Sequence, residues 1–543
     1  IPILRKKLDG ILQTSGAKRG SHDYKEIITI FNSMPKEDLF QASLPELDQE
    51  IRTVVSLLFS DEVQVYLRPD PLDRGVSVMV ILPRGRFSGD VRNRIQNVLT
   101  STFEGEILNY YVAMGAGDQA RLHFYVSASA EKIRAVTADQ LAAEVRRVVR
   151  SWDDELADQL ASRAAAADAH ALSLTYAHAF QDDYRAASSP EVAVQDVEEL
   201  ERLRAAEQGV SIRLRAPLES ERDSQGADFT VLKLYLREER LILSDFMPIL
   251  ENAGIRVINV TPFAVGGDAL PRMMIYSFAV QDPDGKAIDP PTWDALSEGL
   301  LAIRVGDTPS DPFNALILRA GLRWREVDVL RLYANYAFQA GLSPTRFAAA
   351  RALAKYPTLA LLLMRLFTHR FDAGAPEPAG RRSTQNSPAE KLSREIITAL
   401  EGVTALAEDR AIRRILNLIE ATVRTNYFIH GGADPTRRSG GVPYISVKLA
   451  VGEVEELRRN RLLYEIFVYS ARMEGIHLRG ASVSRGGIRW SDRPDDYRTE
   501  ILGLVRTQVV KNAVIVPSGS KGGFITKRPF PEREAMMQEM AEQ

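Results

Sequence analysis

The stretch FTVLKLYLREERLILSDFMPILENAGIRVINVTPF (229–263) decides the fold of the middle of this chain. Its opening residues are rich in β-branched and aromatic side chains, which predicts a strand. LILSDFMPILENAG (241–254) has helical spacing and ends on a glycine, as many helices do. Two further strands are predicted over 255–263 and 272–280. The order strand, helix, strand, strand favours an α+β sandwich unit.

A second unit with a similar order lies nearer the start of the chain. Its strands and its single helix are predicted over 63–67, 76–82, 88–103, 107–114 and 121–128. This alternation is typical of a ferredoxin-like sandwich. The later unit, whose helix ends on a glycine directly before the return strand, resembles half of an ACT-type regulatory domain. That resemblance implies an amino-acid effector bound between paired units, and a packing module without a ligand is the alternative.

Composition sets the class of protein. A chain of 543 residues is long enough for three or four domains, and its 45% hydrophobic and 26% charged residues are typical of globular proteins. A formal net charge of -3 argues against binding to nucleic acid or to an anionic membrane. The most apolar run (358–367) contains Arg365 and is shorter than the ~20 residues that a bilayer requires, so we expect a cytoplasmic protein.

Metal chemistry is not expected either. Cysteine is absent from the sequence, which excludes disulfides and thiolate metal sites. The closest histidine pair, His170 and His178, has no carboxylates around it in the pattern of a metal site. We therefore predict no metal cofactor.

Three cations stand among glycines near the end of the sequence, in SRGGIRWSDRPDDYRTEILGLVRTQVVKNAVIVPSGSKGGF (484–524). Arg485 and Lys521 each precede two glycines, which let the backbone come close to a ligand. A helix that runs into a strand is predicted over 495–516, with Lys511 beside its apolar stripe. Taken singly, each cation is most simply a solvated charge on a turn or a helix. Together they would suit a doubly negative substrate and acid–base work by a lysine.

This stretch, together with LLYEIFVYSARMEGIHLRG (462–480), closely resembles the large NAD-specific glutamate dehydrogenases of bacteria and, more distantly, the small hexameric ones. SHDYKEIITIFNSMPKEDLF (21–40) and RTNYF (424–428) are also similar to the large family, so the likeness extends over nearly the whole chain. It implies oxidative deamination of L-glutamate by NAD to 2-oxoglutarate and ammonia. It also implies ACT-like and helical regulatory regions ahead of the catalytic domain, and a homo-oligomer, with a tetramer expected.

The resemblance assigns roles to the three cations. Lys521 matches the family's catalytic lysine, which polarises the substrate carbonyl or the water of imine hydrolysis. Lys511 matches the lysine that binds the α-carboxylate. Arg485 stands where the small enzymes have a lysine for the side-chain carboxylate, and its guanidinium keeps the charge but offers a bidentate fork. Three glycines beside them are assigned to the same substrate site: Gly486, Gly487 and Gly522.

The predicted elements and the resemblance together give an α+β multidomain fold with six regions. These are a helical lead-in (1–60), an ACT-like unit (61–135), a helical region (136–220), a second ACT-like unit (221–305), a helical domain (306–430) and the beginning of an α/β dehydrogenase substrate domain (431–543). The helical domain is interpreted as a bundle with an apolar core.

Residues for NAD are not found within 1–543. No G-x-G-x-x-G turn follows a strand and opens a helix there, and GAGD (115–118) and VGGD (265–268) are interpreted as hairpin turns. The NAD-binding domain and the family's catalytic aspartate are therefore expected beyond residue 543, and both chain ends are interpreted as cuts in a larger protein. On that interpretation, this chain alone binds NAD poorly and shows no turnover.

Two other functions stay open at this point. A dehydrogenase for another amino acid, such as an aliphatic one, would carry an apolar group where Arg485 offers a charge. An amino-acid-sensing or scaffolding protein would keep the sandwich units but have a degenerate dehydrogenase domain.

Overall fold

The computed structural model of the chain divides into two compact units, residues 1–177 with 188–194, and residues 178–187 with 195–543. It describes the whole chain except for the following residues: 57–61, 73, 115–118, 164–165, 177, 207, 219–220, 222–227, 268–269, 373–386, 430–443, 485, 512–518, 528–533, 535–536 and 539–543. The GAGD turn predicted at 115–118 lies outside the described residues. Among the residues that are described, no helix is both long and apolar enough to cross a membrane.

The first unit is built on a four-stranded antiparallel sheet with the order β1-β2-β4-β3. The strands are β1 (Gln64–Pro69), β2 (Val76–Pro83), β3 (Glu106–Met114) and β4 (Gln119–Ser127). The helices are α1 (Pro2–Ser15), α2 (His22–Ser33), α3 (Lys36–Gln41), α4 (Leu44–Ser56), α5 (Gly89–Phe103), α6 (Ala130–Ala135), α7 (Ala138–Val149), α8 (Trp152–Arg163) and α9 (Ala166–Tyr176). The predicted strands and helix of this unit are confirmed, including Ser88 as the N-cap of α5.

Both faces of this sheet are covered, as the alternation of side chains along β2 shows. Val78 and Val80 belong to the core that contains residues of α5 and α7, whereas Met79 and Ile81 pack against α2 and α4. Neighbouring residues of a strand point to opposite faces, so one strand serves both cores. The helical lead-in (1–60) therefore covers the second face of this sheet.

The face of the sheet that the helical lead-in covers contains a buried charged cluster. Arg68 of β1 pairs with Asp38, and its Nη1 lies 3.7 Å from Oε1 of Glu50. Glu50 is 4% exposed. Burial raises the pKa of Glu50 to about 7, against the attraction of Arg68, and the negative charges of Asp38 and Glu46 add to the shift. This acid is thus held close to its titration point at neutral pH.

Glu50→Gln is expected to stabilise the first unit at pH 8 and to change little at pH 4. The folded-state pKa of Glu50 lies above its ordinary value of 4.5, so ionisation favours the unfolded chain as the pH rises from about 4.5 to about 7. Ionisation of Glu50 thus lowers the free energy of unfolding by an amount of the order of 3 kcal/mol, and the full effect is reached above pH 7. Urea-unfolding midpoints at pH 4 and pH 8 test this, with exposed Glu37→Gln as the control. Equal midpoint shifts for Glu50→Gln at both pH values would contradict it.

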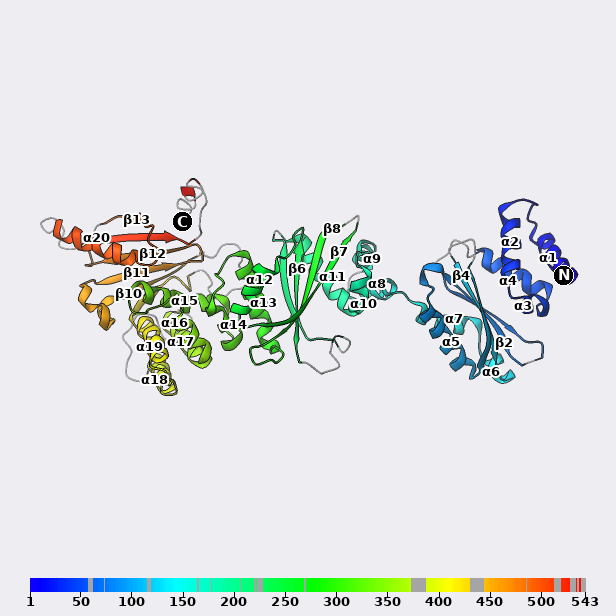
Figure 1. The fold of residues 1–543 in the computed structure, drawn as a ribbon, viewed down its shortest axis with the longest axis horizontal. Helices are drawn as coiled ribbons and strands as arrows, with labels where there is room; N and C mark the ends of the chain where they lie inside the picture. Colours follow the sequence, from blue (N-terminus) through cyan, green and yellow to red (C-terminus); the bar gives the residue numbers. More distant parts are fainter. Residues whose placement is uncertain are drawn as a thin grey trace. The chain divides into compact units, whose positions relative to one another are not determined.

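The second unit begins with another four-stranded antiparallel sheet, of order β5-β6-β8-β7 (Figure 1). Its strands are β5 (Val210–Arg215), β6 (Thr230–Arg237), β7 (Arg256–Gly267) and β8 (Leu270–Gln281), and its helices are α10 (Asp182–Ala187), α12 (Leu243–Asn252) and α13 (Trp293–Val305). Helix α11 (Pro190–Ala205) begins in the first unit and continues into this one. The β-α-β-β order predicted from the opening stretch is confirmed.

Strand β5 was not predicted, because 210–215 was placed at the end of a helical region. VSIRLR alternates apolar and polar side chains, and Ile212 is buried in the core of the second unit. Its register with β6 is fixed by pairs such as Val210 with Leu236. The sheet therefore starts about twenty residues earlier than the sequence indicated.

One face of this sheet packs α12 and α13 through an apolar core, and the other holds a buried polar cluster. Lys233 Nζ lies 2.5 Å from Oδ2 of Asp196, and the Tyr235 hydroxyl donates to Oδ1 of the same carboxylate at 2.7 Å. All three side chains are at most 3% exposed. Burial lowers the pKa of Lys233, although Asp196 opposes the shift. The polar groups of this cluster satisfy one another.

The rest of the second unit places a group of helices against a six-stranded sheet (Figure 1). The sheet order is β13-β14-β12-β11-β10-β9, and every neighbouring pair is antiparallel except β13 with β14. The strands are β9 (Thr422–Thr425), β10 (Ile445–Ala450), β11 (Tyr464–Tyr469), β12 (Met473–Arg479), β13 (Ile488–Trp490) and β14 (Ser520–Thr526). The helices are α14 (Ala315–Ala320), α15 (Trp324–Gln339), α16 (Ala348–Lys355), α17 (Pro357–Phe371), α18 (Pro388–Leu400), α19 (Leu406–Ala421) and α20 (Tyr497–Lys511).

Helix α15 is the centre of this arrangement. Twelve of its 16 residues are buried, and Leu330, Tyr333 and Ala337 share a single apolar core with the two sheets of the second unit. The apolar side chains of α15 form part of the helical core that the sequence predicted. The α+β multidomain fold class is confirmed.

Candidate active site

The strand that follows Gly486 and Gly487 lies beside the strand that carries Lys521, Gly522 and Gly523. β13 runs parallel to β14, with Ile488 opposite Gly522 and Trp490 opposite Phe524. The amide of Gly522 donates to the carbonyl of Gly487 at 3.0 Å. The backbone of Gly486 and Gly487 that leads into β13 therefore runs beside the backbone that carries Lys521.

Three glycines of these segments allow a close approach of the backbone. A Cβ on Gly486 would lie 1.5 Å from the carbonyl oxygen of Ser520, and one on Gly523 would lie 2.4 Å from Cδ1 of Ile501. At Gly522 the nearest atom would be Cγ1 of Ile488, at 2.9 Å. These glycines are required by packing within the protein, whereas the sequence had indicated only a substrate-binding role for Gly486 and Gly522.

Gly486→Ala is expected to disrupt this corner of the sheet, whereas Gly487→Ala should be tolerated. The new methyl group at 486 would overlap a backbone carbonyl, which cannot turn aside without breaking the β13–β14 pairing, but nothing lies within 4 Å of a Cβ on Gly487. Hydrogen exchange of the amides of β13 and β14 measures the effect. Equal protection in the two variants would show that the close approach is unimportant.

Helix α20 covers the same part of the sheet. Its residue Ile501 packs against Gly523, and Gln508, two turns further on, lies against Gly519 at the start of the strand. The helix therefore runs antiparallel to β14, and its last residue, Lys511, belongs to the end that lies over the start of that strand. The predicted helix is confirmed, although it begins at Tyr497 and not at 495.

Lys521 is half-buried and lies on the face of β14 that α20 covers. It shares this face with Gly523, because alternate residues of a strand point the same way. The structure brings Gly486, the C-terminal end of α20 and the start of β14 with Lys521 to one end of the sheet. Arg485 itself and the strand predicted after Lys511 lie outside the described residues, so the meeting of the three side chains stays a prediction.

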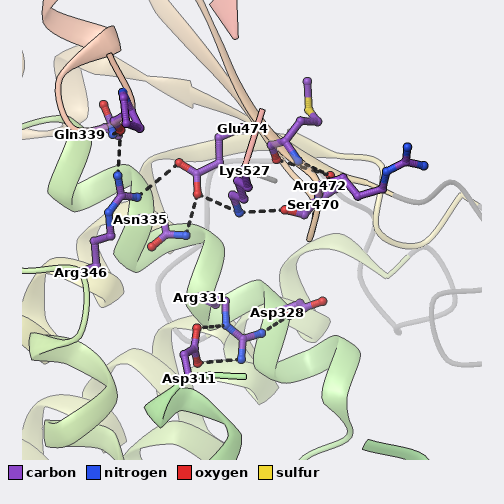
Figure 2. Close-up of polar contacts among 12 residues, drawn as sticks. Asp311, Asp328, Arg331, Asn335, Gln339, Arg346, Ser470, Arg472, Glu474 and Lys527 are labelled. Carbon is purple, nitrogen blue, oxygen red and sulfur yellow. Dashed lines mark hydrogen bonds and ion pairs between the residues drawn. The ribbon is translucent and has the colours of Figure 1, made fainter. Parts of the chain in front are cut away.

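A seam of charged and polar side chains surrounds the buried Glu474 at the contact between α15 and the sheet (Figure 2). Oε1 of Glu474, on β12, accepts from Lys527 Nζ at 2.9 Å and from Asn335 Nδ2 at 2.9 Å. Nη1 of Arg346 lies 3.6 Å from Oε2 of Glu474, which is fully buried. Burial lowers the pKa of the Lys527 ammonium, and Glu474 opposes that shift.

A second carboxylate of the sheet is paired in the same way. Glu465 of β11 accepts from Nε and Nη2 of Arg498, at 2.9 and 2.6 Å, in a bidentate contact. The Tyr336 hydroxyl of α15 donates to Glu465 at 2.7 Å. Because Arg498 lies in the first turn of α20, this contact fixes the start of that helix on both the sheet and α15.

Helix α15 is also anchored by Arg331, one turn before Asn335. This guanidinium contacts both oxygens of Asp311 at 2.8 and 2.9 Å, donates to Thr308 at 3.0 Å, and pairs with Asp328 (Figure 2). Arg331 is 1% exposed. Its buried charge is compensated by two carboxylates, as buried cations require.

This seam was not predicted from the sequence. Its signal was present, because Glu465 and Glu474 interrupt apolar strands at positions that point inward. On α15, Asp328, Arg331 and Asn335 recur at spacings of three and four residues, which puts them on one side of a helix. An inward-facing charge in a strand predicts a buried partner, but not which one.

Two four-stranded antiparallel sheets covered by helices, a further group of helices, and a six-stranded mixed sheet in which β13 and β14 run parallel define a multidomain α+β protein. Comparison with protein families makes this specific. Bacterial NAD-glutamate dehydrogenase, catalytic domain, matches residues 395–543. Glutamate dehydrogenase ACT2 and ACT3 domains match 64–153 and 210–292, and helical motifs 1, 2 and 3 of glutamate dehydrogenase match 1–58, 148–203 and 308–373. The domains of this chain belong to the bacterial NAD-glutamate dehydrogenase family.

Individual relatives agree. The chain is 34% identical over 529 residues to the NAD-specific glutamate dehydrogenase of Pseudomonas aeruginosa. The match covers 97% of this chain and 32% of that protein. It is 34% identical over 528 residues to the protein of the same name from Mycobacterium tuberculosis. That match covers 94% of this chain and 31% of the relative. The chain thus spans about a third of the length of the curated relatives it matches.

Proposed function

We propose that this chain serves an NAD-dependent glutamate dehydrogenase, which oxidises L-glutamate to 2-oxoglutarate and ammonia. The observation that supports this most is the parallel pairing of β13, the strand that follows Gly486 and Gly487, with the strand of Lys521, under the helix that ends at Lys511. Cations from three separate segments suit a substrate with two carboxylates. The names of the relatives support the same activity.

In this proposal each cation has a separate role. Arg485 and Lys511 bind the two carboxylates, and with them orient the substrate. Lys521 polarises the substrate carbonyl, or activates the water of imine hydrolysis, from its half-buried position beside the backbone of Gly487. Holding the substrate between fixed charges lowers the barrier by orientation as well as by charge stabilisation.

NAD is the cofactor implied by the relatives, but no residue of this chain is assigned to it. No glycine-rich turn of the nucleotide-binding kind occurs in 1–543, so the steps proposed here concern the substrate alone. The expectation that this chain by itself shows no turnover stays a prediction.

The regulatory part of the proposal concerns the two sandwich units. We infer an amino-acid effector and assembly as a cytoplasmic homo-oligomer, in keeping with the ACT domains that match these residues. The polar cluster around Asp196 is closed by its own partners, so an effector would bind elsewhere on the units. Calorimetric titration of amino acids tests the effector.

The catalytic proposal is tested by the substrate profile of the complete protein. NAD reduction should proceed with L-glutamate and be far slower with L-leucine, because an apolar side chain leaves Arg485 without a partner. A preference for aliphatic amino acids would favour the alternative dehydrogenase. No reduction with any amino acid would favour the scaffolding alternative.

A further inference from the structure

Strand β14 carries a lysine at each end. Lys521 is its second residue, and Lys527 follows directly after its last. The two lysines are six residues apart, so they lie on the same face of the strand at a separation of about 20 Å. Lys521 belongs to the proposed substrate site, whereas Lys527, which is 22% exposed, belongs to the seam around Glu474 and is not explained by the proposed reaction.

We propose that Lys527 is a positioning residue for Lys521: its ion pair with Glu474, which is held in turn by Asn335 of α15, fixes the register of β14. This inference rests on the proposed function for the role of Lys521. The register itself can be tested without that function.

The sequence of β14 makes such a fixing point necessary. SKGGFIT contains two adjacent glycines, and glycine-rich strands specify their pairing register weakly because they offer few side chains to pack. A slip of two residues against β12 would keep the same face inward and most backbone hydrogen bonds. It would, however, carry Lys521 roughly 7 Å along the sheet.

The contacts of Lys527 exclude that slip. Its ammonium donates to the carbonyl of Ser470 at 2.8 Å, lies 3.9 Å from the ring centre of Tyr469, and pairs with Glu474 at 2.9 Å. All three partners belong to the turn and strands of the β11–β12 hairpin. A displaced β14 would leave the fully buried Glu474 without its nearest charge, which is costly in the protein interior.

Helix α15 also fixes the position of α20, the helix that ends at Lys511. Asn335 donates to Glu474, and Tyr336, the next residue, donates to the Glu465 that holds Arg498 at the start of α20. One helix thus sets the positions of the strand that carries Lys521 and of the helix that ends at Lys511.

Lys527→Met in the complete protein tests the proposal. We expect the hydrogen-exchange protection of the amides of β14 to fall, while that of β10 is unchanged. We also expect kcat with glutamate to fall about 100-fold, since a misplacement of an ångström or more at a reacting group has an effect of this size. The KM for NAD should not change, which separates displacement of Lys521 from general unfolding.

Two further variants keep the test decisive. Lys355→Met removes the lysine of an exposed Lys–Glu pair with the same 2.9 Å separation, so it controls for the chemical change and should alter neither readout. Asn335→Ala removes one neutral hydrogen bond to Glu474 and should lower both β14 protection and kcat in a smaller degree. Unchanged β14 protection in a folded Lys527→Met protein overturns the proposal, as does unfolding of both seam variants. If the wild-type protein does not oxidise glutamate, the proposed function fails, and the exchange of β14 still decides the register.

Discussion

Lys521→Met is expected to lower kcat for glutamate-dependent NAD reduction by about 10³-fold, because it removes the acid–base group from the site. The side chain is half-buried on β14, and methionine keeps the length of its stem. The fold should therefore persist. Steady-state kinetics of the complete protein measure the effect, and circular dichroism confirms folding.

Two variants show what the Lys521 result means. Lys521→Arg keeps the positive charge but cannot give up a proton near neutral pH, so it should be almost as inactive if proton transfer is the role of this residue. Lys448→Met removes another half-buried lysine of the same sheet, one that lies over the ring of Tyr464, and should keep wild-type activity. A Lys521→Met protein with kcat within a few-fold of wild type would refute the assignment of Lys521.

Arg498→Met should destabilise the sheet and α20 by about 3–5 kcal/mol, since it leaves the fully buried Glu465 without its charged partner. The Tyr336 hydroxyl still donates to that carboxylate, but a single neutral donor does not replace a bidentate guanidinium. Hydrogen exchange of β11 and α20 amides, together with thermal unfolding, measures the loss.

Two further variants test whether burial of the ion pair, and not the loss of a positive charge alone, causes the destabilisation by Arg498→Met. Arg493→Met removes the arginine of an exposed pair with Asp496, five residues earlier, and should leave protection unchanged. The double variant Arg498→Met/Glu465→Gln removes both buried charges and should recover much of the stability lost in the single variant. If the exposed and buried arginines proved equally costly to remove, burial would not be the cause.

Much of the fold followed from local patterns. The strands of the two sandwich units and helices α5 and α12 were predictable, because alternation and helical spacing reveal which side of an element is buried. Strand β5 was missed since it is short and follows a long charged helix, and only its pairing with β6 makes it a strand. Pairing between distant segments is not encoded in the pattern of either one.

The candidate site divides in the same way. The glycines and cations of 484–524 and the family they resemble were recognisable from residue types and spacing alone, since these depend only on the order of the chain. Tertiary structure decided that β13 lies parallel to β14, that Gly486 and Gly523 are needed for close packing, and that Lys527 meets Glu474 and Asn335. Asn335 and Glu474 are 139 residues apart in sequence, and an ion pair or hydrogen bond over such a distance has no local signature. Which buried charge meets which partner depends on how the helix α15 and the sheet pack, and that is settled only when the chain is folded.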